Sequence, residues 1–95
     1  MLTILFDVTV KKGLEEEFAG LAKEMMRSTH AHDDGCVTFV WHRQVDDPRT
    51  FALYEQWRDQ ASVDAHLARL LGEIGRDRMF GFFEHTFARR LEPIE

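Results

Sequence analysis

The spacing of hydrophobic residues constrains the fold of this chain more than any other feature of its sequence. Apolar and polar residues alternate in residues 2–10, 50–57 and 82–91, and residues 36–45 are rich in β-branched and aromatic side chains. Apolar residues instead recur at helical spacing after Gly13 and again after Asp59. Alternation is typical of strands, and the longer spacing is typical of amphipathic helices. The resulting order, β-α-β-β-α-β, predicts an α+β fold, a ferredoxin-like sandwich with a four-stranded antiparallel sheet.

Turn and capping residues separate these segments. Residues 46–49, Asp-Asp-Pro-Arg, predict a tight reversal, so the second and third strands are expected to form an antiparallel hairpin. Asp59 is placed to cap the second helix, and Gly72 and Gly75 mark where that helix bends or stops. Residues 76–81 are expected to form a short helical turn before the last strand.

Length and composition favour one folded unit. A chain of 95 residues is too short for two hydrophobic cores, so we expect a single domain over residues 1–95. Hydrophobic residues make up 44% of the chain and charged residues 31%, which is the balance of a globular protein rather than a disordered one. The formal net charge is −5 and the basic residues are scattered, which argues against a nucleic-acid partner.

Cysteine content and the N-terminal residues indicate the compartment. Cys36 is the sole cysteine and has no partner for an internal disulfide. The first residues lack the basic leader and long apolar run of a secretion signal, and no apolar stretch approaches the roughly 20 residues needed to cross a bilayer. We therefore expect a cytoplasmic protein without a membrane partner.

The predicted sheet is apolar on both faces, although two helices can cover only one of them. One set of alternating positions holds Phe6, Phe39, Trp41, Leu53, Trp57 and Phe87, and the other holds Leu5, Val40, Tyr54, Phe82 and Ala88. Leaving large side chains in water forfeits roughly 1.5–3 kcal/mol each, so we expect a homodimer in which two sheets pack face to face. The alternative is a monomer, because a register slip of one residue would exchange the two faces.

Five short stretches form a pattern that covers almost the whole chain. They are Gly35-Cys36-Val37-Thr38-Phe39, Asp46-Asp47-Pro48, Phe51-Ala52-Leu53-Tyr54-Glu55-Gln56-Trp57, the segment from Ala61 to His66-Leu67, and Arg90-Leu91-Glu92-Pro93-Ile94. In this order and spacing the pattern resembles the antibiotic biosynthesis monooxygenase family of dimeric α/β-barrel proteins. The resemblance implies homodimers with a pocket in each subunit between the helices and the sheet. Family members include cofactor-free oxygenases of quinol-like or polyketide aromatics, haem-degrading enzymes and isomerases of signal-molecule breakdown, and fold similarity does not choose among them.

The haem-degrading branch can be compared residue by residue. Its members use an asparagine on the first strand, and a tryptophan and a haem-ligating histidine after the third strand. In this chain the corresponding positions hold Phe6 or Asp7, His66 and Arg76. None of them matches, and an arginine cannot ligate haem iron, so the resemblance does not extend to haem degradation.

His66 and Glu55 are the candidate catalytic residues. His66 lies beside the apolar stripe of the second helix, and a histidine there can take a proton from a phenol or orient a carbonyl. Glu55 alternates with apolar residues, so we expect it to face the helices with a pKa raised by burial, and to pair with His66 or orient a substrate hydroxyl. The alternatives are a structural histidine at the core boundary and an ion pair of Glu55 with Arg69 or Arg89.

Large side chains are available to line a flat pocket for an aromatic substrate. The candidates are Met25, Phe6, Phe39, Trp41, Trp57 and Phe83. Most of them are also expected to fill the core, because periodicity does not separate pocket lining from packing. Tyr54 has the opposite parity and is expected at the dimer interface.

The remaining histidines give no clear site. His30, His32, Asp33 and Asp34 lie close together, but they lack an evident third and fourth metal ligand, so we expect a solvated turn rather than a metal centre. No role can be assigned to His42 or His85 on the strands. Glycine-rich phosphate loops, nucleophile elbows and paired cysteine motifs are absent from the sequence.

Taken with the family resemblance, these residues favour a cofactor-independent monooxygenase that acts on a small aromatic or quinol-like molecule. Removing a proton from such a molecule makes an anion that can give an electron to oxygen, so the protein needs a base, a dry pocket and a fitting shape. His66 would be the base, aided by Glu55, with no bound cofactor and no metal. The alternatives are an isomerase or lyase that uses the same pocket for proton transfer, and a non-enzymatic dimer that binds a small molecule.

Overall fold

The computed structural model describes residues 1–95 and confirms the predicted order of elements. The strands are β1 (Leu2–Val10), β2 (Cys36–Gln44), β3 (Asp47–Trp57) and β4 (Phe83–Leu91). The helices are α1 (Glu15–His32), α2 (Gln60–Ile74) and the short α3 (Arg76–Gly81), which is the helical turn expected before the last strand. The order β-α-β-β-α-α-β is that of a ferredoxin-like sandwich with one short helix added.

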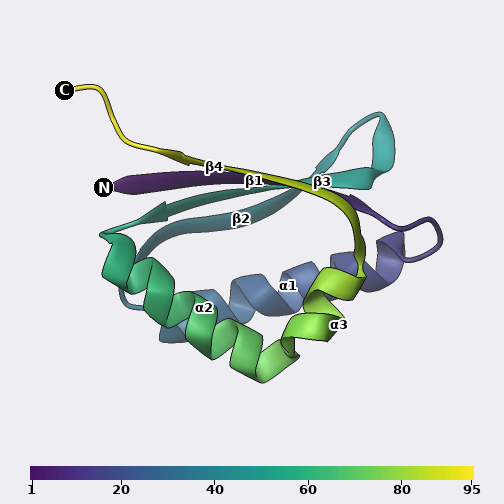
Figure 1. The fold of residues 1–95 in the computed structure, drawn as a ribbon, viewed down its shortest axis with the longest axis horizontal. Helices are drawn as coiled ribbons and strands as arrows, with labels where there is room; N and C mark the ends of the chain where they lie inside the picture. The colour runs from purple at the N-terminus through teal and green to yellow at the C-terminus, as the bar shows by residue number, and fades with distance from the viewer.

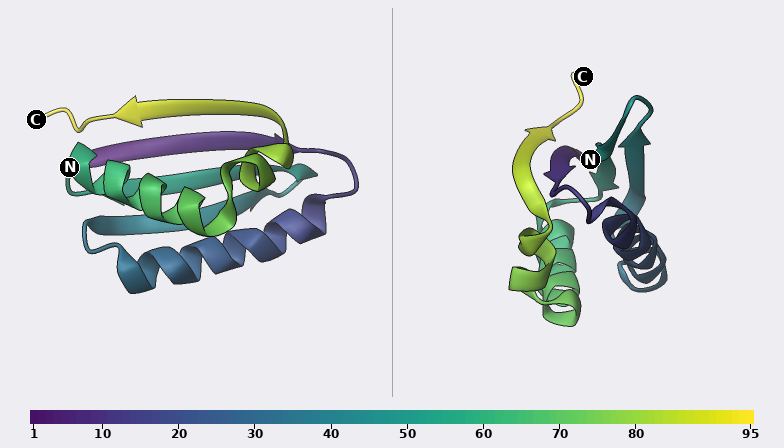
Figure 2. Two further views of the ribbon diagram at one scale, coloured as in Figure 1. Left: turned by 60° about the horizontal axis from the view of Figure 1, so that its bottom comes forward. Right: turned by 90° about the vertical axis from the view of Figure 1, so that its right-hand side faces the viewer.

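The four strands form one antiparallel sheet in the order β2-β3-β1-β4. All three helices lie on one face of this sheet, and no element covers the other face (Figure 1). Figure 2 shows α1 beneath the β2 edge, with α2 and α3 beneath the β4 edge. We call the helix-covered face the inner face and the opposite one the outer face. None of the helices combines the length and the apolar character needed to span a bilayer.

Local signals set the ends of α2 as predicted. At its start, Asp59 Oδ1 accepts a hydrogen bond from the backbone N–H of Ser62 at 2.9 Å, which satisfies one of the free amides of the first turn. At its end, Gly75 has a φ of 94°, a left-handed conformation that glycine adopts at little cost. The chain therefore changes direction at Gly75 and enters α3.

The hydrophobic core lies between the inner face and the helices. At its centre is Phe18 of α1, whose side chain is fully buried. The ring centroids of Trp41, Phe51, Phe82 and Phe83 lie 4.9–5.6 Å from that of Phe18, in edge-to-face arrangements. Such aromatic contacts add to the stabilisation from burial, so Phe18 fixes α1 against the sheet.

The hairpin between β2 and β3 turns earlier than the sequence predicted. Gln44 pairs with Asp47, so Val45 and Asp46 form the turn and Pro48 already lies within β3. The pairing with β2 is irregular just after this point. A proline has no N–H to donate to the ladder, and this irregularity explains how it is accommodated near the start of a strand.

Regular alternation along residues 82–91 would place Phe83 and His85 on the same face of the last strand, but the structure places them on opposite faces. Phe83 pairs with Val10 of β1 and is buried, whereas His85 pairs with Thr9, the residue adjacent to Val10. Glu84 is therefore an extra residue in β4, a β-bulge. Because side chains alternate along a strand, a bulge exchanges the two faces for every residue beyond it.

The bulge also overturns two other face assignments. Phe87, predicted to share a face of the sheet with Phe6 and Trp57, lies opposite Asp7 on the outer face and is 60% exposed. Ala88, predicted for the other set, lies opposite Phe6 on the inner face. Phe82 precedes β4 and packs against Phe18 in the core instead of facing a second sheet.

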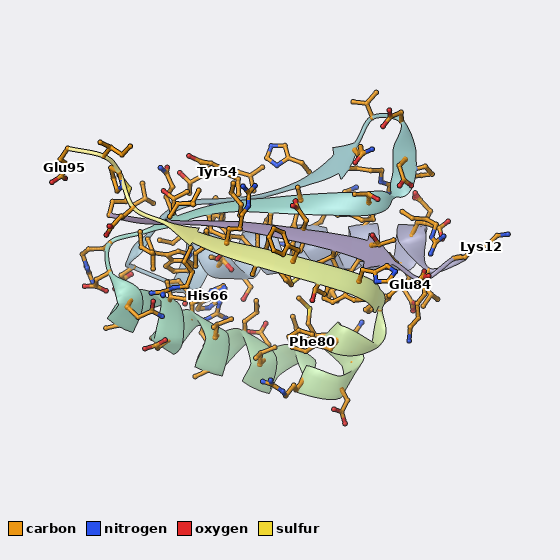
Figure 3. All side chains as sticks on the ribbon, turned by 45° about the horizontal axis from the view of Figure 1, so that its top comes forward. Lys12, Tyr54, His66, Phe80, Glu84 and Glu95 are labelled. Carbon is orange, nitrogen blue, oxygen red and sulfur yellow. The ribbon has the colours of Figure 1, made fainter.

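The outer face nevertheless carries exposed apolar side chains, as the sequence predicted. Tyr54 on β3 lies between Leu5 on β1 and Val40 on β2 in the sheet register. Figure 3 shows Tyr54 on the side of the sheet away from the helices. Apolar or aromatic side chains that are exposed on this face belong to Val40, Tyr54, Phe87 and Leu91. The fold by itself leaves this surface uncovered.

Candidate active site

An apolar cavity of about 300 Å³ lies between the inner face and the helices α2 and α3. Most of its walls are hydrophobic, and they come from Ile4, Phe6, Met25, Phe39, Trp41, Leu53, Val63, Leu67, Leu70, Leu71, Met79, Phe80 and Ala88. The polar lining residues are Glu55, Gln60, His66 and Arg90. Figure 3 shows His66 and Phe80 on the helices below β4, on the side of the sheet opposite to Tyr54. A space of this size suits a small organic molecule.

Strand alternation places Glu55 in the floor of this cavity. On the inner face, Glu55 of β3 lies opposite Ile4 of β1 on one side and Phe39 of β2 on the other. Its side chain is 7% exposed. The prediction that Glu55 faces the helices is therefore confirmed.

Glu55 has no charged partner. Its Oε1 accepts a hydrogen bond from the indole Nε1 of Trp57 at 2.8 Å. Burial raises the pKa of Glu55 to about 7, and the bond from Trp57 opposes this rise only in part. The raised pKa was predicted, whereas the two predicted pairings, with His66 or with an arginine, are wrong. Near neutral pH this carboxyl group is therefore able to hold or release a proton.

His66 lies on α2 above the same floor and is 2% exposed. Its ring packs against the rings of Trp57 and Phe39, with centroid separations of 4.5 Å and 5.1 Å. The Nδ1 atom lies 2.7 Å from Oδ2 of Asp33. Burial lowers the pKa of His66, and Asp33 opposes this effect. The imidazole is thus a buried, neutral group on the cavity wall.

Asp33 is the functional candidate that sequence reasoning missed. It follows α1 directly and its side chain is 8% exposed, and Arg69 of α2 donates to both of its oxygens at 2.9 Å and 2.8 Å. Burial raises the pKa of Asp33, but the hydrogen bonds from Arg69 and His66 outweigh this and leave it lowered. One signal was available in the sequence, because His66 and Arg69 are three residues apart and share a helix face.

The structure divides the predicted pocket residues into two groups. Phe6, Phe39, Trp41 and Met25 line the cavity. Trp57 and Phe83 do not line it: Trp57 is fully buried beneath His66, and Phe83 packs against Phe18 in the core. Trp57 still bears on the site, because it donates the hydrogen bond to Glu55.

The other histidines lie outside the cavity. His30 Nε2 lies 3.0 Å from the carbonyl oxygen of Phe39, and His32 Nδ1 lies 2.9 Å from that of Ser28. His42 and His85 are on the outer face. No group of three or more histidine, cysteine, aspartate or glutamate side chains is arranged to hold a metal ion. Asp33, part of the sequence cluster considered for a metal, instead binds His66 and Arg69.

Fold and cavity together define the class of protein. The chain is a ferredoxin-like α+β protein whose sheet and helices enclose an apolar space with a histidine and a carboxyl group in its walls. Within this class, the chain belongs to the antibiotic biosynthesis monooxygenase family, whose family model matches residues 1–70. The matched part contains β1, α1, the hairpin and most of α2, and it includes Glu55, His66 and Asp33.

Solved structures agree on the fold. PA3566 from Pseudomonas aeruginosa superposes with a TM-score of 0.83 at 21% identity, over 99% of this chain and 94% of that protein. Rv0793 from Mycobacterium tuberculosis superposes with a TM-score of 0.85 at 16% identity, over 99% and 95%. A structure described as an antibiotic biosynthesis monooxygenase superposes with a TM-score of 0.82 at 19% identity over the full length of both chains. At these identities the similarity shows the fold alone.

One curated relative matches more weakly. The uncharacterized protein sll1783 of Synechocystis is 23% identical over 65 residues. That alignment covers 68% of this chain and 44% of the relative, so the chain spans less than half of the relative's length. This match adds no activity.

Proposed function

We propose that this protein is a cofactor-independent monooxygenase that acts on a small aromatic or quinol-like molecule bound in the inner cavity. One observation carries the proposal: a buried, neutral His66 lines a mostly apolar cavity, with only its Nδ1 engaged by the protein. A base that is held in a dry cavity can take a phenolic proton without competition from water. Membership of the family supports the same class of reaction.

The proposed reaction needs no redox group other than the substrate and dioxygen. His66 takes the proton of a ring hydroxyl, and the resulting phenolate gives one electron to dioxygen. The substrate radical and superoxide then combine to form a C–O bond at a ring carbon. The peroxide loses water as the ring C–H proton leaves, so one oxygen atom stays on the ring as a quinone carbonyl and the other departs as water. The substrate supplies all four electrons.

The apolar walls fit this chemistry. Phe6, Phe39 and Trp41 present aromatic surfaces, and Met25 adds a flexible wall from α1. A planar ring can stack on such surfaces, and the exclusion of water keeps the phenolate reactive toward oxygen. The small volume limits the substrate to a few fused rings.

A second candidate activity is an isomerase or lyase, and Glu55 is the observation that favours it. Burial raises the pKa of Glu55 to about 7, so this carboxyl group can donate a proton near neutral pH. His66 lines the same cavity and can accept one. A base and an acid on two walls of one cavity are what a keto–enol isomerisation requires, and such a reaction consumes no oxygen.

Oxygen uptake separates the two activities. Purified protein is mixed with a panel of hydroxylated benzenes, naphthalenes and anthrones in an oxygen electrode, and products are identified by mass spectrometry. If the protein is a monooxygenase, we expect one dioxygen to be consumed per quinone formed, and one atom of labelled dioxygen to appear in the product. Turnover without oxygen uptake would favour the isomerase, and binding without turnover would leave only a ligand-binding protein.

His66 variants test the base directly. We expect His66→Ala and His66→Gln to lower turnover by roughly 10²–10⁴-fold, because general-base catalysis contributes about this much. Glutamine is included because alanine leaves a void at a buried position, and thermal unfolding of both variants shows whether they fold. His85→Ala, an exposed change on the outer face, is the matched control. Full activity in a folded His66→Gln protein would exclude His66 as the base.

We also propose that a second copy of this chain covers the outer face. The apolar side chains that are exposed there, Val40, Tyr54, Phe87 and Leu91, come from strands β2, β3 and β4 of the same face. A two-fold axis would place this surface against itself and bury both patches in one contact. The inner cavity lies on the other face, so each subunit would keep its own site.

A further inference from the structure

The hydrogen bond between His66 and Asp33 fixes which ring nitrogen carries the proton. Asp33 is an ionised carboxylate because Arg69 and His66 hold its pKa low despite its burial. An ionised carboxylate accepts hydrogen bonds and donates none. At a separation of 2.7 Å, His66 Nδ1 must therefore carry the hydrogen. In the neutral ring, the lone pair that can accept a proton is then on Nε2.

Arg69 holds Asp33 in a fixed orientation. Its Nε donates to Oδ1 at 2.9 Å and its Nη2 donates to Oδ2 at 2.8 Å, which is the two-pronged geometry of an arginine–carboxylate pair. The Nη1 atom of Arg69 also donates to Ser28 Oγ and Glu73 Oε2, both at 2.8 Å. Arg69 is thus anchored to α1 and α2 at once, and it restrains the carboxylate that contacts His66.

The two charges have opposite effects on the imidazole. The negative charge of Asp33 favours a protonated ring, and the positive charge of Arg69 disfavours it. Burial also favours the neutral ring and is the largest influence, so the pKa of His66 stays below its usual value. Asp33 therefore orients the ring without leaving it permanently charged. Other charged or titratable groups also lie near the three side chains. Glu55 of β3 and Arg90 of β4 line the cavity with His66, Cys36 of β2 lies near Asp33 and Glu55, and Glu73 pairs with Arg69. A shallow pocket beside Asp33 is lined by His32, Asp34, Arg58 and Asp59.

We propose that Asp33 and Arg69 form a positioning pair that holds His66 with Nδ1 protonated and Nε2 free to act as the base. The catalytic role of the pair rests on the proposed function. The orientation of the His66 ring by Asp33 and Arg69 does not depend on the proposed function. The pair joins the end of α1 to the middle of α2, so it also fixes the wall of the cavity from which the imidazole projects.

The tautomer is measured first, without any substrate. Long-range ¹H–¹⁵N NMR correlations of the histidine rings distinguish a protonated Nδ1 from a protonated Nε2. For the intact protein at pH 7.5 we expect His66 to show a protonated Nδ1 and an unprotonated Nε2. A ring with a protonated Nε2 would overturn the proposal at this step.

Two substitutions then predict changes of opposite sign. In Asp33→Asn the favourable negative charge is lost, so the titration midpoint of His66 is expected to fall by about one pH unit. In Arg69→Met the opposing positive charge is lost and Asp33 remains, so the midpoint is expected to rise by about the same amount. A role in packing alone would not shift the two midpoints in opposite directions. Shifts of the same sign, or no shift in both, would overturn the proposal.

Two further variants keep the test valid if a substitution unfolds the protein. Arg69→Lys keeps the charge and loses the two-pronged contact, so its midpoint is expected to stay close to that of the unchanged protein while the ring signals broaden. Arg27→Met removes an exposed arginine of α1 that pairs only with Glu24, and it is the matched control for loss of a positive charge.

Kinetics connect the pair to the reaction. Once a substrate is found, Asp33→Asn is expected to lower kcat by roughly 10–10³-fold with little change in KM, because the base is misoriented while the cavity is intact. In Arg69→Met the rise of kcat with pH is expected to move to higher pH. If the NMR shifts occur as predicted and no aromatic substrate is turned over, the proposed function fails and the effect of the pair on His66 stands.

Discussion

Glu55 shows how one buried side chain couples the site to stability. Burial raises its pKa to about 7, above its ordinary value of 4.5. Between these two pH values the folded protein retains a proton that the unfolded chain has released. The stability that this group contributes is therefore fully present below pH 4.5 and is lost as the pH rises through 7.

The corresponding prediction concerns the pH dependence of stability. Because of Glu55, we expect the free energy of unfolding of the unchanged protein to fall by roughly 3 kcal/mol between pH 4.5 and 7.5. In Glu55→Gln this fall is expected to be absent. Urea unfolding of both proteins across this range measures the difference. His66 acts in the opposite direction, because its pKa is lowered and its contribution is lost as the pH falls. For that reason the test is the difference between the two proteins, and parallel curves would contradict the prediction.

The two tryptophans provide a matched pair at the same scale. Trp57 Nε1 donates to Glu55, whereas Trp41 Nε1 is buried without an acceptor. We expect Trp57→Phe to raise the titration midpoint of Glu55 by roughly one pH unit, because the hydrogen bond that favours the ionised carboxylate is lost. Trp41→Phe is expected to leave the midpoint unchanged. Carboxyl ¹³C NMR titration measures both, and an equal effect of the two changes would refute the assignment.

At the scale of elements, the start of β2 and the first turn of α2 approach each other at Gly35. The Gly35 carbonyl accepts a hydrogen bond from the backbone N–H of Arg58 at 2.9 Å. A Cβ atom on Gly35 would lie 2.1 Å from Ser62 Oγ and 2.4 Å from Ser62 Cβ. Ser62 cannot move away freely, since its hydroxyl donates to the capping residue Asp59 at 2.7 Å. Glycine at position 35 therefore permits the contact between the two elements.

Substitution of two glycines tests this contact. We expect Gly35→Ala to lower the free energy of unfolding by roughly 1–3 kcal/mol, the usual cost of overpacking. Gly20→Ala is the control, because a Cβ there meets nothing within 4 Å on an exposed face of α1. This change is expected to stabilise the protein by about 0.5–1 kcal/mol through helix propensity. Denaturant unfolding measures both, and a stable Gly35→Ala protein would show that the two elements separate easily.

At the scale of the whole molecule, the outer face of the sheet determines which oligomer we expect. We expect a particle of about 22 kDa in solution, twice the chain mass of 11.1 kDa, if a second copy covers this face. Tyr54→Asp and Phe87→Asp place charges at exposed positions and are expected to give monomers that still fold. Val45→Asp, at the fully exposed hairpin turn, is the control. Sedimentation equilibrium decides between the masses, and an unmodified protein that sediments as a folded 11 kDa monomer would refute the dimer.

Periodicity and local turn and capping residues were sufficient to predict the element order, the antiparallel hairpin, the cap at Asp59 and the inward orientation of Glu55. These features depend on neighbours within a few positions of the chain, so the residues that determine them are visible together. The five short stretches that resemble the family were together sufficient to indicate it, and four of the six predicted pocket residues line the cavity.

Only the tertiary structure decided the faces of β4 and the partners of the two candidate catalytic residues. The bulge at Glu84 arises from the pairing of β4 with β1, which are far apart in the chain, and it moved Phe87 to the outer face. Asp33 and Arg69 are 36 residues apart and meet because α1 and α2 pack on the same face of the sheet. A hydrogen bond between distant residues depends on the path of the whole backbone, and local periodicity carries no information about that path.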